Sequence, residues 1–133
     1  TLFRSGRAIK LPVSAPFHCS MLQPAAEKLE DELNKISINK LNGIVMSNVK
    51  GEAYLEDDNI IDLLTSQVKK PVLFINDIEK MIESGVDTFI EIGPGKALSG
   101  FVKKINKNVT VLNVEDLKSL EKTLSKLREM EVL

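Results

Sequence analysis

The chain has 133 residues, of which 43% are apolar, so it is large enough to fold as one ordinary domain with a hydrophobic core. Its 18 basic and 19 acidic side chains are interspersed, which argues against a cationic nucleic-acid-binding protein or a membrane-surface protein. One cysteine and one histidine exclude an internal disulfide and a zinc cluster, and no apolar run approaches the length of a membrane span. We therefore expect a cytoplasmic protein.

The first predicted element is a strand that leads into a helix. Residues 8–13 alternate apolar and polar side chains, as in a half-buried strand, and Pro12 and Pro16 mark its end. Ser20 is followed three residues later by a glutamine, the spacing of a capping box. Apolar residues then recur every three or four positions over residues 21–36, which predicts an amphipathic helix that begins near Ser20.

The only histidine, His18, falls between this strand and this helix. The amino end of a helix disfavours a positive charge, which helps to keep a nearby imidazole neutral and able to accept a proton. Position alone leaves two interpretations open, a packing or capping residue and a general base. A dyad with the neighbouring Cys19 is disfavoured because adjacent residues at a helix start point in different directions, so Cys19 is interpreted as a small buried thiol.

The middle of the chain is predicted to hold one strand and two helices. An Asn-Gly turn signal precedes a short buried strand at 44–49. Acidic residues then open a helix at 57–68, which stops because Lys70 precedes a proline. A second helix at 72–84 ends at Gly85, which suits a carboxyl-terminal cap.

Strands and helices alternate in the last part of the chain. The predicted elements are a strand at 88–92, a helix at 96–105, a strand at 109–114 and an amphipathic helix that follows the capping residue Asp116. This alternation predicts parallel strands joined by helical crossovers. The fold class is therefore α/β.

A glycine turn between a predicted strand and a predicted helix, Gly93-Pro94-Gly95, occupies the place where phosphate-binding loops occur. The spacing does not fit, since a P-loop would need glycine in place of Ile90 and a dinucleotide fingerprint would need glycine in place of Leu98. We therefore interpret the turn as structural. None of the ten serines lies in a G-x-S-x-G nucleophile elbow, and no carboxylate pair stands out for acid-base chemistry.

Five stretches of the sequence occur in the order and spacing of one enzyme family. They are residues 10–26 (KLPVSAPFHCSMLQPAA), Ser47-Asn48-Val49, Gln67 followed by Pro71-Val72, Gly85-Val86, and residues 91–100 (EIGPGKALSG). Over residues 6–133 the chain resembles the malonyl-CoA:acyl-carrier-protein transacylases of bacterial fatty acid synthesis, and residues 10–26 resemble the histidine motif of that family.

The resemblance implies a domain organisation. Residues 17–133 would form the C-terminal part of an α/β-hydrolase-like acyltransferase domain, preceded at residues 1–16 by the last strand of a small ferredoxin-like subdomain. A common sequencing adaptor could encode residues 1–5, so we expect these to be non-native and the chain to be a fragment.

The resemblance also implies the transfer of a malonyl group from coenzyme A to acyl carrier protein through a serine ester. His18 matches the general base and acid, and Gln67 matches the residue whose backbone carbonyl orients the imidazole. Acyl carrier protein and a coenzyme A thioester are the implied partners, with no nucleic acid, no membrane, no metal or redox cofactor, and a monomeric full-length enzyme. The family's serine and its malonyl-binding arginine would lie upstream, so we expect this fragment to be inactive alone.

Two alternatives stay open at this point. The first is an acyltransferase domain of a polyketide or multidomain synthase, which shares the same residues and would be identified by long flanking domains in the parent gene. The second is a non-catalytic α/β binding module that binds a phosphate ligand at the Gly93 turn. Phosphate binding by this chain that is lost on Gly95→Val would favour the second alternative.

The aromatic residue beside the histidine, Phe17, is predicted to line the substrate pocket. A bulky ring there would narrow the space around the substrate α-carbon and favour malonyl over methylmalonyl groups by about 1 to 3 kcal/mol, the scale for one methyl group in a pocket. In the complete enzyme, we expect Phe17→Ser to raise the rate with methylmalonyl-CoA relative to malonyl-CoA. An unchanged ratio of the two kcat/KM values would contradict this role.

Overall fold

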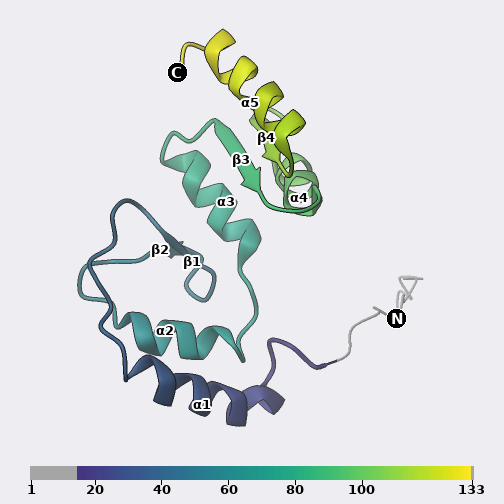
Figure 1. Ribbon diagram of the computed structural model, residues 1–133. Coiled ribbons are helices and arrows are strands. Elements are labelled where there is room, and N and C mark those ends of the chain that lie inside the picture. Colours follow the sequence, from purple (N-terminus) through teal and green to yellow (C-terminus); the bar gives the residue numbers. More distant parts are fainter. Residues whose placement is uncertain (1–14, 133) are drawn as a thin grey trace, which may run out of the picture.

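The computed structural model describes residues 15–132 (Figure 1). Its elements are the 3-10 helix η1 (Ser20–Leu22), α1 (Gln23–Leu33), β1 (Met46–Ser47), β2 (Glu52–Ala53), α2 (Ile60–Gln67), α3 (Phe74–Glu83), β3 (Thr88–Ile92), α4 (Ala97–Ile105), β4 (Thr110–Val114) and α5 (Leu117–Glu129). No helix among these is long and apolar enough to cross a membrane. The predicted strand at 8–13 and the residues 1–5 expected to be non-native lie outside the described residues, and the domain boundary after residue 16 stays a prediction.

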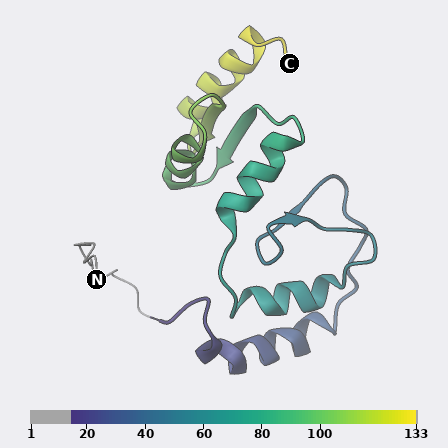
Figure 2. The same ribbon diagram turned by 180° about the vertical axis from the view of Figure 1, so that it is seen from behind.

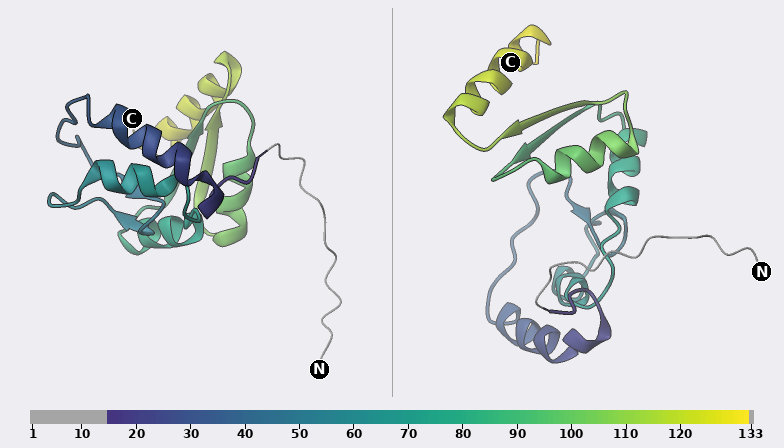
Figure 3. Two further views of the ribbon diagram at one scale, coloured as in Figure 1. Left: turned by 90° about the horizontal axis from the view of Figure 1, so that it is seen from below. Right: turned by 90° about the vertical axis from the view of Figure 1, so that its right-hand side faces the viewer.

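The carboxyl-terminal part is a β3–α4–β4–α5 unit. β3 and β4 pair in parallel, from Thr88 opposite Thr110 to Ile92 opposite Val114. α4 forms the crossover between the strands and α5 packs against β4, and Figure 3 (right) shows the two helices on opposite sides of the strand pair. The predicted parallel pairing, and with it the α/β fold class, is confirmed.

The helix α3 connects this unit to the amino-terminal half of the chain. Figure 2 shows α1, α2 and the β1–β2 hairpin on one side of α3 and the strand pair on the other. Phe74 of α3 and Phe101 of α4 meet edge to face, with ring centroids 6.3 Å apart, which fixes α3 against the strand-pair unit. The buried apolar side chains of the described residues come from both halves and are Ala26, Ile78, Val102 and Leu127.

The first helix differs from its prediction in how it begins and where it ends. Helical structure does begin at Ser20, but as a 3-10 turn, and no side chain caps either η1 or α1. The predicted capping box does not form: the Gln23 Oε1 that would accept from the cap residue accepts from Lys69 instead, and its Nε2 donates to Glu27. α1 ends at Leu33, three residues before the predicted end, and packs against α2.

The predicted strand at 44–49 is wrong in length and in its surroundings. Only two of its residues form β1, which pairs antiparallel with β2 in a short hairpin that the sequence pattern did not predict. The following helix begins at Ile60 rather than at 57, because Asn59 caps it and Asp58 accepts hydrogen bonds from the Leu55 amide and from Lys50. The Asn59 cap, together with the contact of Asp58 with the hairpin turn, therefore sets where α2 begins.

The hairpin turn lies so close to α3 that it requires glycine at position 51. Gly51 has φ of +69°, and a Cβ built there would lie 2.8 Å from Cβ of Asn76. We expect Gly51→Ala to lower the free energy of unfolding by about 1 to 3 kcal/mol more than Gly85→Ala, because overpacking adds to the conformational cost. Gly85 is the matched control, since its φ is +94° but nothing lies within 4 Å of its Cβ position.

The two substitutions are to be compared by urea unfolding of otherwise identical proteins. Equal losses of stability for the two variants would show that the turn is not pressed against α3.

Candidate functional site

His18 lies in the turn that leads into η1, and its backbone is in the left-handed region, with φ of +59°. This conformation is costly for a residue with a Cβ and persists only where the surroundings impose it. The side chain is exposed, and its Nδ1 lies 2.9 Å from the backbone oxygen of Gln67, 49 residues further along the chain. The structure therefore brings together the two residues that the sequence singled out.

This hydrogen bond assigns the protons of the imidazole. A carbonyl oxygen can only accept, so His18 Nδ1 must donate to it. In the neutral ring, the other nitrogen, Nε2, then carries the free lone pair and is the atom that can take a proton. His18 is thus arranged as a proton acceptor at Nε2, and the hydrogen bond at Nδ1 fixes the orientation of its ring.

The Gln67 carbonyl is available because Gln67 is the last residue of α2, where backbone oxygens lack partners within the helix. The carboxyl end of a helix carries partial negative charge, which favours an N–H donor there. Beside this bond, Lys69 donates from Nζ to the Gln23 side chain at 2.6 Å and so ties the end of α2 to the start of α1. His18 lies in the segment just before α1, so the bond between these two helix ends also keeps that segment near the end of α2.

An open apolar hollow of about 370 Å³ lies beside the imidazole. It is lined by His18, Leu29, Leu33, Leu64, Gln67 and Val68. These residues come from the pre-helical turn and the facing sides of α1 and α2, so the hollow combines one polar ring with an aliphatic wall.

The side chains of the two residues next to His18 in the sequence make no hydrogen bond with the imidazole. Cys19 is half-buried rather than buried, and its thiol donates to the carbonyl of Pro16 at 3.1 Å instead of contacting the imidazole. A Cys–His dyad is therefore not formed. Phe17 is 61% exposed, so its predicted role in a substrate pocket stays a prediction.

A hydrogen-bonded chain continues behind the histidine. The Gln67 side chain donates from Nε2 to Asn48 Oδ1 at 3.4 Å, and Asn48 donates from Nδ2 to Asp77 Oδ2 at 2.5 Å. Asp77 lies on α3 and is only 2% exposed. Burial raises the pKa of its carboxyl group, and the hydrogen bond from Asn48 opposes that effect.

Sequence reasoning missed Asp77, because a carboxylate on an amphipathic helix is usually on the solvated face. The available signal was its spacing: Asp77 lies four residues from the cap residue Leu73 and four from Met81, so it falls on the side of α3 that carries these apolar side chains. Asn48 was noted only as part of a three-residue motif.

Carboxylates of the chain itself accept hydrogen bonds from three backbone amides at and after the glycine turn. The carboxylate of Glu91 accepts hydrogen bonds from the amides of Leu98 and Ser99 at the start of α4, at 3.2 and 2.7 Å. Glu115 accepts from the Gly95 amide at 3.1 Å and pairs with Lys96 at 3.3 Å. These internal carboxylates occupy the positions that an anion would take, so the structural interpretation of the turn is supported.

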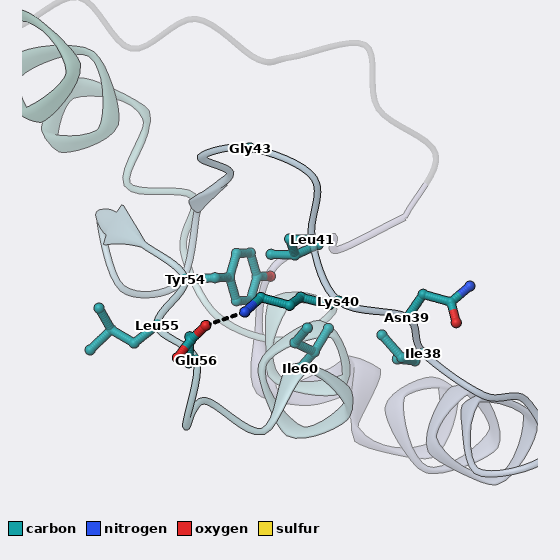
Figure 4. Close-up of a pocket in the computed structure, with 9 residues that line it drawn as sticks. All are labelled: Ile38, Asn39, Lys40, Leu41, Gly43, Tyr54, Leu55, Glu56 and Ile60. Atoms are coloured by element: carbon teal, nitrogen blue, oxygen red, sulfur yellow. Dashed lines mark hydrogen bonds and ion pairs between the residues drawn. The ribbon is translucent and has the colours of Figure 1, made fainter.

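A second hollow, of about 590 Å³, lies between the loop after α1 and the loop before α2 (Figure 4). Its polar feature is an ion pair of Lys40 with Glu56, whose side chains are 80% and 83% exposed and therefore contribute little. None of the predicted site residues lines it. Residues 15–132 hold no cluster of side chains that could bind a metal ion.

No family model matches the chain, but the proteins and structures similar to it include transacylases. The malonyl CoA-acyl carrier protein transacylase of Bacillus subtilis (strain 168) is 44% identical over 123 residues, which are 92% of this chain and 39% of that protein. The crystal structure of malonyl CoA-acyl carrier protein transacylase from Clostridium perfringens is 98% identical, with a TM-score of 0.94, over 96% of this chain and 40% of that chain.

A second similar structure contains a type II PKS acyl-carrier protein in complex with its malonyl-transacylase. It is 34% identical, with a TM-score of 0.82, over 87% of this chain and 38% of that chain. The chain therefore spans about two fifths of the length of the curated relatives that it matches.

The buried carboxyl group of Asp77 gives a pH dependence whose sign is opposite to that of most aspartates. Its pKa is raised in the folded state, so the folded protein binds this proton more tightly than the unfolded chain does. Its contribution to stability is present below the unfolded value of about 3.9 and is lost as the pH rises through the folded value. We expect Asp77→Asn to gain stability relative to the parent as the pH rises from about 4 to 7.

Urea unfolding of both proteins across this pH range measures the difference. Asp31→Asn, which removes an exposed carboxylate on α1, is the control for the loss of one charge. A difference between parent and Asp77→Asn that does not change with pH would contradict the expectation.

Proposed function

The chain belongs to the malonyl CoA-acyl carrier protein transacylase family, of whose members it spans about two fifths, and from this premise we propose that the whole protein moves a malonyl group from coenzyme A to an acyl carrier protein. The single observation that supports this activity most directly is the hydrogen bond between His18 Nδ1 and the Gln67 carbonyl. It leaves Nε2 as the basic atom beside an open hollow.

In the proposed reaction, His18 Nε2 takes the proton of a serine hydroxyl while the serine oxygen attacks the malonyl thioester. The thioester C–S bond breaks, a malonyl–serine ester forms, and the proton passes to the departing thiolate of coenzyme A. In the second half, Nε2 takes the proton of the phosphopantetheine thiol, and the sulfur attacks the ester. The ester C–O bond breaks, a malonyl thioester of the carrier protein forms, and Nε2 gives the proton to the departing serine oxygen. The serine belongs to the remainder of the protein, because these 133 residues hold no G-x-S-x-G elbow.

Gln67 has the role that an aspartate has in the usual serine triad. Its neutral carbonyl fixes the ring direction and the Nδ1–H tautomer without a full counter-charge. The reaction as proposed needs no metal or redox cofactor, since the charge changes at sulfur and oxygen are met by proton transfer. Phe17 is proposed to narrow the acyl pocket once the remainder of the protein covers it.

The proposed partner is an acyl carrier protein that carries a phosphopantetheine thiol, and the proposed setting is the cytoplasm, with the full-length enzyme a monomer. One similar structure pairs a malonyl-transacylase with a type II PKS acyl-carrier protein, so a polyketide carrier is the second candidate acceptor. Transfer rates to purified carrier proteins of both kinds discriminate between them. The binding-module alternative has little support, because carboxylates of the chain already accept from three of the amides at and after the Gly93 turn.

We expect His18→Asn in the full-length protein to lower kcat for malonyl transfer by about 10²- to 10⁴-fold, the usual contribution of a general base. Asparagine is chosen because it tolerates the left-handed backbone that position 18 requires. The assay follows radiolabelled malonyl from malonyl-CoA to holo acyl carrier protein. Cys19→Ala is the control, since the thiol contacts Pro16 and not the imidazole.

Wild-type rates for His18→Asn would refute the general-base role. A loss in Cys19→Ala as large as that in His18→Asn would indicate that the turn, and not the imidazole, is being tested. The isolated 133-residue chain serves as the negative control, because it lacks the serine elbow.

A further inference from the structure

Three successive hydrogen bonds lead from the exposed imidazole to a buried carboxylate. They join His18 to the Gln67 backbone at 2.9 Å, the Gln67 side chain to Asn48 at 3.4 Å, and Asn48 to Asp77 at 2.5 Å. The proposed reaction uses only the first. The other two link the end of α2 to the hairpin turn, and the hairpin turn to α3.

In this series of hydrogen bonds, the side-chain amides of Asn48 and Gln67 each have a fixed orientation. The Asp77 carboxylate can only accept, so it selects the Nδ2 side of Asn48 and turns Oδ1 toward Gln67. Oδ1 can in turn bond only the NH₂ side of Gln67. Each bond therefore determines the donor and acceptor of the next.

The backbone of Asn48 is held as firmly as its side chain. Its carbonyl accepts from the Leu73 amide at 2.8 Å, just before α3 begins. The turn is closed by the amides of Lys50 and Gly51, which donate to the Ser47 carbonyl at 3.0 and 2.8 Å. Asn48 is thus anchored to α3 through both its backbone and its side chain, and it in turn holds the Gln67 side chain.

We propose that Asp77 and Asn48 are positioning residues for His18, which act by fixing the Gln67 side chain and thereby the direction of the Gln67 carbonyl that binds Nδ1. This inference rests on the proposed function for its effect on rate, but the arrangement itself concerns only the tautomer and orientation of the imidazole. The side chain and the carbonyl belong to one residue at the end of α2, where no further helical turn holds the backbone. Restraining the side chain therefore restrains the acceptor.

Gln67→Leu tests this most cleanly, because it removes the Nε2 donor and keeps the backbone carbonyl. Asp77→Leu removes the carboxylate, and Asp77→Asn offers an oxygen that can still accept from Asn48. Thr123→Val is the matched control: Thr123 is also buried and donates to the Asn113 carbonyl at 3.0 Å, but its bond lies between α5 and β4. The variants are made in the full-length protein.

The primary readout is the tautomer of His18, from the nitrogen chemical shifts of the neutral imidazole in protein labelled with ¹⁵N-histidine, with His18→Asn identifying its signals. We expect the Nδ1–H tautomer to predominate in the parent and in Thr123→Val. Its population should fall in Gln67→Leu and Asp77→Leu and be largely restored in Asp77→Asn. In the transfer assay, kcat should fall about tenfold in Gln67→Leu and in Asp77→Leu, with KM unchanged. A fall of about tenfold is the effect of one lost hydrogen bond on a rate.

An unchanged tautomer in Gln67→Leu would overturn the proposal, and so would an equal change in Thr123→Val, which would indicate general destabilisation. Should Asp77→Leu fail to fold, Gln67→Leu decides alone. A parent protein without transfer activity would count against the proposed function only, since the tautomer measurement needs no turnover.

Discussion

The hydrogen bond between His18 Nδ1 and the Gln67 carbonyl is the contact on which the rest of the site depends. It determines which ring nitrogen is basic, and it joins residues 49 positions apart, so that the loop it closes contains α1, the hairpin and α2. The bond can form only if α1 packs against α2 and the turn before η1 takes up its strained backbone at His18. Much of the amino-terminal half therefore contributes to placing His18 Nδ1 against the Gln67 carbonyl oxygen.

The sequence predicted best those elements whose ends are set by local signals. β3 and α5 begin as predicted, because Gly85 ends α3 ahead of β3 and Asp116 caps α5 with a bond from the Ser119 amide at 2.7 Å. The start of α2 has a local signal too, its cap Asn59, but the prediction followed the acidic residues before it. The hairpin was missed because it depends on contacts across the turn, such as Lys50 with Asp58. No periodicity in one segment can reveal a contact with another.

The same distinction applies to the site. His18 and Gln67 were found from motif order, and the structure joins them, although their chemical roles remain proposals. Asp77 carries no motif, and it matters only because α3 places it beneath the hairpin turn, where it is 2% exposed. The Gly93 turn shows the reverse case, since its sequence suggests an anion site that Glu91 and Glu115 occupy from within the chain.

Because His18 and Gln67 are far apart in the sequence, the state of the imidazole depends on correct folding of the segment between them. The basic nitrogen is selected only after α1 has docked on α2, so a chain in which these helices are loose does not hold its histidine in the Nδ1–H form. Under the proposed function, misassembled molecules should then turn over more slowly than docked ones. Specific activity would in that case fall as the fraction of correctly docked molecules in a preparation falls.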